Sequence, residues 1–134
     1  MKATELVIGD WVNCDLCQEP QQIVELYETQ VMLQYCDLYD YTEIEPIPLT
    51  PEILVKNGFE RISKSPYKTE YRVCFDEDNN DFLFVCIHHL RDYVAVYYNP
   101  LNRMVHLDCN IENCMVHELQ HALKLCGIDK EIIL

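Results

Sequence analysis

Short β-rich runs separated by turn residues fill most of this chain of 134 residues, and they restrict its fold more than any other feature. The runs that we predict as strands are Leu6–Val12, Gln22–Tyr27, Thr29–Tyr35, Tyr41–Ile47, Glu70–Phe75, Phe82–His88, Tyr93–Tyr98 and Met104–Leu107. Short strands joined by tight turns pair as antiparallel neighbours. Because two helical segments accompany these strands, the chain is predicted to be an α+β protein.

The strand pattern predicts two lobes. The first four runs, within residues 1–49, have the spacing of a small SH3-like β-barrel, with Trp11 in its core or at its rim. Residues 50–134 are predicted to form an antiparallel sheet that is packed by a C-terminal helix. The chain length suits two small lobes that together form one compact unit.

Two helices are marked by the residues at their ends. Thr50 is a suitable N-cap, Pro51 fits the first helical position, and Gly58 closes this connector helix. A second helix is predicted from about residue 110 to Cys126, with Gly127 as its C-terminal cap. The first helix should join the lobes, and the second should cover the sheet.

The charge of the chain limits its partners. The chain has 23 acidic and 10 basic residues, which gives a formal net charge of −13. A nucleic-acid partner is therefore not expected, because phosphate contacts need Lys and Arg. No apolar run approaches the roughly 20 residues of a membrane helix. The first residues lack a secretory signal, so we expect a cytoplasmic location and no membrane contact.

The eight cysteines are expected to stay reduced in that compartment. Cys74, Cys86 and Cys126 lie within apolar runs and are predicted to be small buried side chains. Cys14 and Cys17 form a CxxC pair, which could be half of a zinc site or a redox pair. No second pair with suitable spacing follows, and the strand-to-helix context of a redox motif is missing, so we interpret them as incidental loop cysteines.

The sequence HELQH at residues 117–121 matches the HExxH pattern of zinc hydrolases. In a helix, His117 and His121 would bind zinc from one face, with Cys114 on the same face and Glu118 as general base. We expect this face to point away from the apolar side of the helix. Only 13 residues follow His121, and they offer no evident further ligand. We therefore predict no catalytic residue, no cofactor and no metal, with a zinc-dependent hydrolase as the alternative.

Three segments give the chain a resemblance to a family. The stretch EPIPLTPEILVKNGF, the run LVIGDWV and the helix entry VHELQ look like those of an uncharacterised family of small proteins from prophages and mobile elements of gut Bacteroidales. The resemblance implies that the position of Glu118 is often Gln and that the second histidine, His121, is not a family feature. The family has no established activity, so the resemblance implies architecture and origin alone.

We therefore predict a non-enzymatic, acidic protein-interaction module with a basic protein partner. The predicted interaction surface comprises Asp37, Tyr39, Asp40, Tyr41 and Glu43. A solvated strand edge is the simpler interpretation of the same residues.

A third hypothesis is that the chain is an SH3-like accessory protein that associates with nucleic acid. It depends on a local basic patch, since four basic residues lie close together in the sequence: Lys56, Arg61, Lys64 and Lys68.

Overall fold

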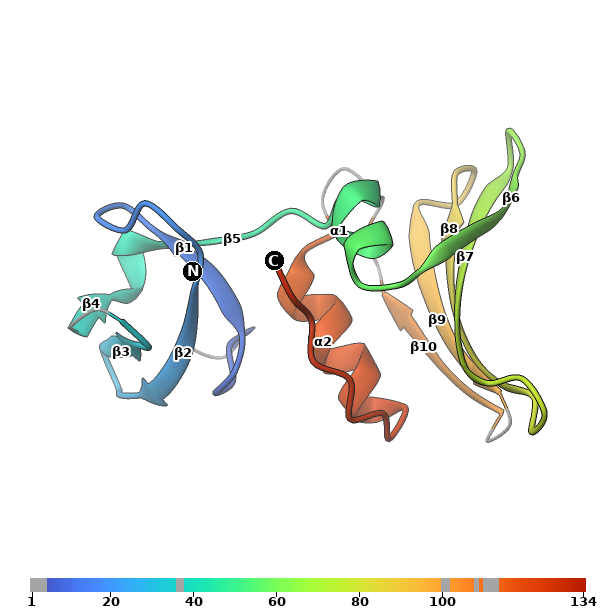
Figure 1. The fold of residues 1–134 in the computed structure, drawn as a ribbon. Coiled ribbons are helices and arrows are strands. Elements are labelled where there is room, and N and C mark those ends of the chain that lie inside the picture. Colours follow the sequence, from blue (N-terminus) through green and yellow to red (C-terminus); the bar gives the residue numbers. More distant parts are fainter. Residues whose placement is uncertain (1–4, 36–37, 100–101, 108, 110–113) are drawn as a thin grey trace. The chain divides into compact units, whose positions relative to one another are not determined.

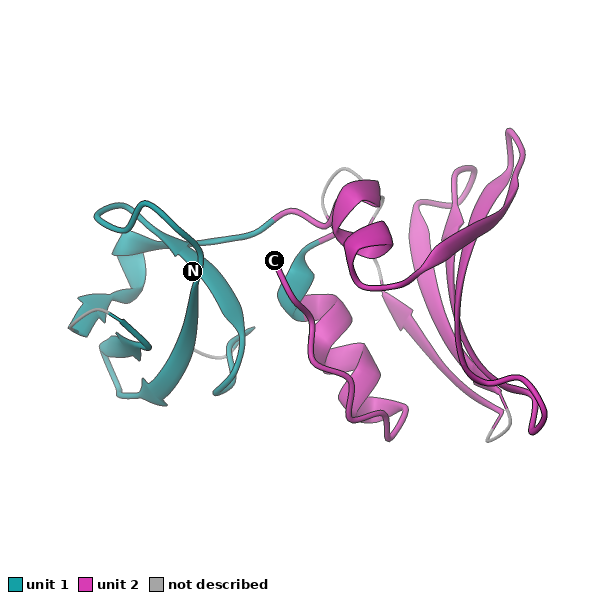
Figure 2. Ribbon diagram, viewed as in Figure 1, with its two compact units in different colours: residues 1–47, 115–117 teal, residues 48–114, 118–134 magenta. Residues whose placement is uncertain are grey.

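The computed structural model describes residues 5–35, 38–99, 102–107, 109 and 114–134. Within these ranges it contains two five-stranded antiparallel sheets and short helices (Figure 1), which confirms the predicted α+β class. The chain divides into two compact units (Figure 2). Unit 1 comprises Met1–Ile47 and Met115–His117, and unit 2 comprises Pro48–Cys114 and Glu118–Leu134.

Unit 1 contains one sheet with the strand order β4-β3-β2-β1-β5. Its strands are β1 (Trp11–Cys14), β2 (Gln21–Leu26), β3 (Gln30–Leu33), β4 (Leu38–Asp40) and β5 (Ile44–Pro46). No pairing joins the end strands β4 and β5 among the described residues, so the sheet is open there. The inward positions of the strands form a core of Leu6, Val12, Cys14, Ile23, Val31, Leu33 and Ile44.

Two of the predicted strands in unit 1 are corrected. The run Leu6–Val12 is a strand with a turn at Gly9, as its residues indicate, but the strand begins only at Trp11, because fully buried Asp10 accepts a hydrogen bond from the backbone N–H of Val7 (2.8 Å). The run Tyr41–Ile47 is interrupted by a 3-10 turn, η2 (Tyr41–Glu43), that precedes β5. Local side-chain bonds thus end the extended conformation that the apolar pattern predicts.

Unit 2 contains a meander with the strand order β10-β9-β8-β7-β6. Its strands are β6 (Glu60–Lys64), β7 (Lys68–Asp76), β8 (Asp81–His88), β9 (Tyr93–Asn99) and β10 (Arg103–Leu107). Its helices are α1 (Pro51–Lys56) and α2 (Val116–Leu125), and the first two residues of α2 belong to unit 1. No described helix is long and apolar enough to cross a membrane.

The predicted start of the first helix is confirmed, whereas that of the second is not. Thr50 caps α1, because its hydroxyl accepts a hydrogen bond from Ile53 N–H (3.3 Å), as predicted. The predicted start of the second helix is wrong at Cys114, which precedes α2 in an extended segment and whose carbonyl accepts a bond from Leu49 N–H (2.8 Å). The earlier part of that prediction, residues 110–113, lies outside the described residues.

The sheet of unit 2 has two different faces. Both helices lie on one side of it, and no described element of unit 2 covers the other side (Figure 1). The covered side is apolar and buried, with Tyr71, Val73, Leu83, Val85, Ile87, Val94 and Val96. The register places Glu70, Cys86, Ala95 and His106 side by side on the opposite side, which we call the open face.

Candidate functional site

The HELQH motif lies at the start of α2, but its side chains do not share an exposed face. His117 is buried, with 7% of its surface exposed, whereas Glu118 and His121 are partly exposed. Burial of His117 means that the helix face that carries both histidines is not an exposed surface at this residue. Cys114 is not on the helix, so the predicted helical grouping with His117 and His121 is wrong.

A different set of potential metal ligands does come together. Among the described residues, the ligand atoms of Cys109, Cys114 and Glu118 lie within 4.8 Å of one another. Both cysteines are buried. This grouping includes neither histidine of the HELQH motif.

The other cysteines occupy varied environments. Cys14 belongs to the core of unit 1, and its thiol donates a hydrogen bond to Cys17 Sγ (2.8 Å). Cys126 is buried, as predicted, and Cys86 is half-buried. The prediction that Cys74 is buried is wrong, because its register opposite Phe82 places it on the open side near the end of the hairpin.

The predicted acidic surface of unit 1 makes local contacts. Tyr39 and Tyr41 pack against the core, and Tyr41 Oη donates to the Tyr27 carbonyl (2.6 Å). Asp40 and Glu43 form the capping box of η2, in which the backbone N–H of Asp40 donates to Glu43 Oε2 (2.9 Å). These contacts give each described side chain a structural role. Asp37 lies outside the described residues.

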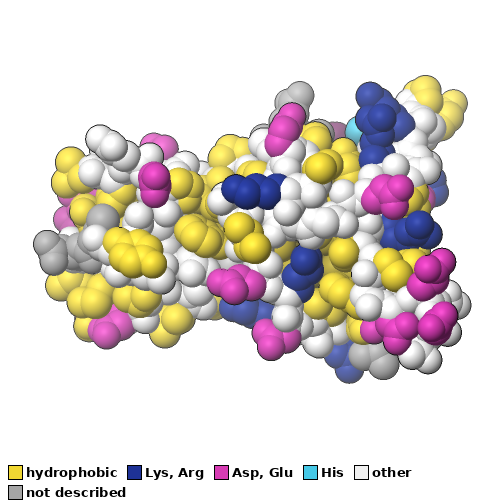
Figure 3. Space-filling view, viewed as in Figure 1, with side chains coloured by type: hydrophobic (Ala, Val, Ile, Leu, Met, Phe, Trp, Pro, Cys, Tyr) yellow, Lys and Arg dark blue, Asp and Glu magenta, His cyan; other side chains and the backbone are white. Residues whose placement is uncertain are grey.

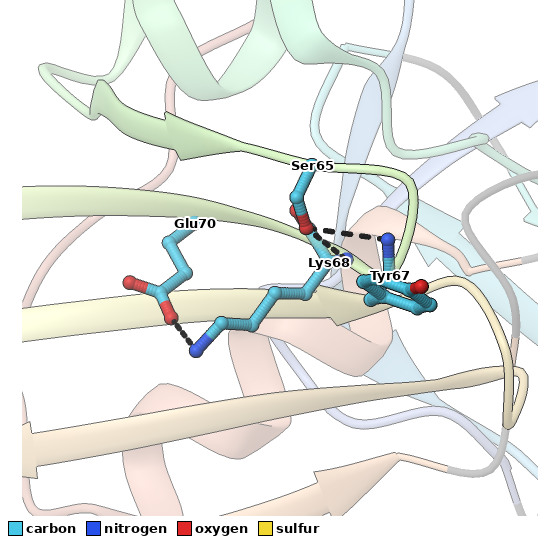
Figure 4. Close-up of polar contacts among 4 residues, drawn as sticks. All are labelled: Ser65, Tyr67, Lys68 and Glu70. Atoms are coloured by element: carbon cyan, nitrogen blue, oxygen red, sulfur yellow. Dashed lines mark hydrogen bonds and ion pairs between the residues drawn. The ribbon is translucent and has the colours of Figure 1, made fainter.

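The predicted basic patch is exposed and in part paired. Lys56 ends α1, Arg61 and Lys64 lie on the edge strand β6, and Lys68 begins β7. The Lys68 ammonium forms an ion pair with Glu70 (Figure 4), and this contact raises the pKa of Lys68. Figure 4 also shows the turn before β7, where Ser65 Oγ accepts bonds from the backbone N–H groups of Tyr67 and Lys68 (3.2 and 3.1 Å).

Aromatic side chains line the open face of unit 2. Phe84 lies between Phe82 and Tyr97, with ring centroids 6.2 Å apart in both pairs. The Arg72 guanidinium lies over the Phe82 ring, 4.9 Å from its centroid, which is a cation–π contact. A sheet face that meets only water normally carries polar side chains, so this row of rings sets the open face apart from an ordinary solvated face.

A hollow of about 370 Å³ lies beside this row, at the end of the sheet near the β8–β9 turn. It is lined by His88, Arg91, Tyr93, Ala95, Met104 and His106. Tyr93 stacks on His88, with centroids 4.1 Å apart and planes inclined by 18°, and its centroid lies 4.3 Å from that of His106. The small side chain of Ala95 leaves room beside these rings.

The electrostatics of the hollow differ from those of the whole chain. None of its six lining residues is acidic, although the chain has 23 acidic residues. Partial burial, and then the positive charge of Lys68, lower the pKa of His88, so its ring is neutral at pH 7. Arg91 is exposed and supplies a permanent positive charge. The hollow therefore offers stacking surfaces, two imidazoles and one guanidinium.

The sequence contained a signal for this site that our prediction did not use. A strand with one solvated face alternates apolar and polar residues, but in β8 and β9 four outward positions are aromatic. Phe82, Phe84, Tyr93 and Tyr97 are these positions. Cys86 and Ala95 lie on the same face, and the inward positions are apolar, so the signal is a set of aromatic residues on one face of the sheet.

Comparison with known proteins adds no identification: no family model, curated protein or solved structure matches the chain. The function is therefore argued from the chemistry of the open face.

Proposed function

We propose that this protein is a non-enzymatic interaction module, and that it binds a protein partner through the open face of the sheet in unit 2. The observation that carries the proposal is the aromatic hollow beside Arg91, which has no acidic lining residue in a chain of net charge −13. Three of its lining residues, Arg91, Tyr93 and Met104, are of types that protein interfaces concentrate at their centres.

The shape and charge of the hollow specify the partner segment. A flat side chain can stack on Tyr93 and rest over Ala95, while a carboxylate next to it can pair with the Arg91 guanidinium. Met104 is 67% exposed and adds adaptable apolar surface at the rim. We infer that the partner presents an aromatic residue beside Asp or Glu.

A single-stranded nucleic acid would also stack on these rings, but the charges favour a protein. Of the basic side chains on this face, Lys68 is paired with Glu70 and Arg72 lies over Phe82, which leaves Arg91 as the cation beside the hollow. The net charge of −13 repels a polyanion over long distances, whereas one carboxylate meets a local positive charge.

Four further expectations from the sequence remain proposals about this protein. They are an SH3-like barrel, a cytoplasmic location, an origin in the Bacteroidales mobile-element family, and contact with a basic partner through the surface at Tyr39 to Glu43. We place the main binding site in unit 2, since Asp40 and Glu43 already cap η2.

The proposal predicts which peptides the full chain selects from a displayed random library. Enriched peptides should contain Trp, Tyr or Phe next to Asp or Glu. Arg91→Glu should weaken binding of the best peptide at least about tenfold, because it replaces attraction to a carboxylate by repulsion. Arg61→Glu is the matched control, since Arg61 is also exposed but lies on β6, outside the hollow.

Two results would contradict the proposal. One is enrichment of peptides without an aromatic residue, or equal losses in both arginine variants. The other is tight binding of a single-stranded oligonucleotide that weakens steeply with salt and needs Tyr93, which would move the assignment to nucleic acid.

A further inference from the structure

We propose that Cys109, Cys114 and Glu118 form a binding site for a zinc-class divalent metal ion. The site is separate from the open face and differs from the zinc site that the HELQH motif suggests. Its ligand atoms, two thiol sulfurs and one carboxylate oxygen, already lie within 4.8 Å of one another. Zinc bonds of about 2.3 Å to sulfur in a tetrahedron place ligand atoms roughly 3.7 Å apart, so small movements would complete the geometry.

The three ligands come from separate, anchored positions. Cys109 follows β10, and its backbone N–H donates to the Leu107 carbonyl (2.8 Å). Cys114 lies before α2, with its carbonyl bonded to Leu49 N–H. Glu118 is in the first turn of α2. A hydrogen bond from a distant segment therefore holds Cys114, and the first turn of α2 holds Glu118.

Both cysteines of this metal-ligand grouping are buried. Cys114 is fully buried and Cys109 is 6% exposed. Burial, and then the neighbouring Cys109 and Glu118, raise the pKa of Cys114 far above that of an ordinary thiol. A divalent cation that binds here replaces the thiol protons, so metal binding releases protons.

The ligand types select the metal. Thiolates favour zinc and its spectroscopic substitute cobalt, whereas calcium and magnesium require oxygen ligands. Three protein ligands leave one position of a tetrahedron for water or for a further side chain. His121 follows Glu118 by about one helical turn, so it is the residue of α2 to test for that position.

The test uses the full chain, purified without a histidine tag and kept reduced, and titrated with Co²⁺. We expect one equivalent to bind, with a sulfur-to-cobalt charge-transfer band and the intense visible bands of a tetrahedral ion, both removed by Zn²⁺. Cys114→Ser and Cys109→Ser should abolish the charge-transfer band or weaken Co²⁺ binding at least a hundredfold. Glu118→Gln should weaken binding about tenfold while the sulfur band stays.

Control variants separate a lost site from a damaged fold. Cys126→Ser changes another fully buried thiol outside the cluster and should leave cobalt binding unchanged. Zn²⁺ should slow alkylation of Cys109 and Cys114, read by mass spectrometry, without changing the rate at the exposed Cys74.

Three outcomes would overturn the proposal. The first is the absence of a sulfur band together with weak, non-stoichiometric binding. The second is binding that survives both cysteine substitutions but is lost in His121→Ala, which would restore the HELQH site. The third is a Cys109–Cys114 disulfide that persists under reduction and excludes metal.

Discussion

The side chain of Asn57 joins two segments that are distant in the sequence. Its amide Nδ2 donates to the carbonyls of Ile53 and Ile133 (both 2.8 Å), and its Oδ1 accepts from Ile133 N–H (2.7 Å). Asn57 itself is 5% exposed, and the neighbouring Ile132 is 1% exposed. One asparagine therefore holds the segment that contains Ile132 against the end of α1, at a place where backbone groups have little access to water.

At this residue scale, we predict that Asn57→Ala lowers the free energy of unfolding by about 2–4 kcal/mol. The reason is that the buried side chain of Asn57 makes three hydrogen bonds, two of them to the backbone of Ile133, and all three are lost. Urea unfolding of the full chain measures the change. Asn13→Ala, at an exposed position of β1, is the control and should change stability by no more than about 0.5 kcal/mol. Equal effects of the two substitutions would refute the proposed role.

Both helices end in the same structural motif. After α1, Gly58 N–H donates to the Val55 carbonyl and Phe59 N–H to the Leu54 carbonyl. After α2, Gly127 N–H donates to the Lys124 carbonyl (3.0 Å) and Ile128 N–H to that of Leu123 (2.9 Å). This is the Schellman pattern, which satisfies carbonyl groups at a helix end and requires a positive φ at the glycine. Arg103 adds a bond from Nη1 to the Cys126 carbonyl (3.3 Å).

At the scale of this element, Gly127→Ala should destabilise the protein more than Gly9→Ala. Both glycines have positive φ, +78° and +96°, so each substitution costs about 1–2 kcal/mol of backbone strain. A Cβ at residue 127 would also lie 2.7 Å from Arg103 Nη1, whereas Gly9 has open space. Arg103 would then move and lose its bond, adding about 1 kcal/mol.

A double variant isolates that added cost. In an Arg103→Ala background, Gly127→Ala should cost only as much as Gly9→Ala, as measured by chemical unfolding. If the cost of Gly127→Ala stays the same in that background, the guanidinium does not contribute to the helix end.

Charge is divided unequally in the whole molecule. Residues 1–47 hold ten of the 23 acidic residues and one of the ten basic residues, a net charge of −9. The described part of unit 1 therefore has no Lys or Arg, and Figure 3 shows the basic side chains over unit 2 alone. Repulsion among the carboxylates of unit 1 opposes its compact state, and salt screens this repulsion.

We therefore predict that the melting temperature rises by a few degrees between low and moderate NaCl concentration, as measured by calorimetry. Replacing Glu19 and Glu28 by Gln should reduce this dependence, because both lie exposed in the acidic unit. Replacing Glu77 and Asp78 of unit 2 by Gln and Asn is the matched control and should reduce it less. A melting temperature that does not change with salt in the unmodified protein would contradict the argument.

The sequence determined the features that depend on neighbouring residues. Thr50, Pro51 and Gly58 fixed the ends of α1, because capping and positive φ act over a few residues. Apolar runs located most strands of unit 2, since side-chain alternation follows directly from strand geometry. The edge strand β6 was missed, because its five residues are exposed and lack an apolar pattern.

Only the tertiary structure decided which side chains meet. It brought His88, Tyr93 and His106 from three strands into one hollow, and it grouped Cys109, Cys114 and Glu118 apart from the HELQH histidines. It also started α2 at Val116, after a segment held by Leu49. Such placements depend on strand register and on hydrogen bonds between distant segments, and these are set by the folded chain as a whole rather than by the spacing of residues along it.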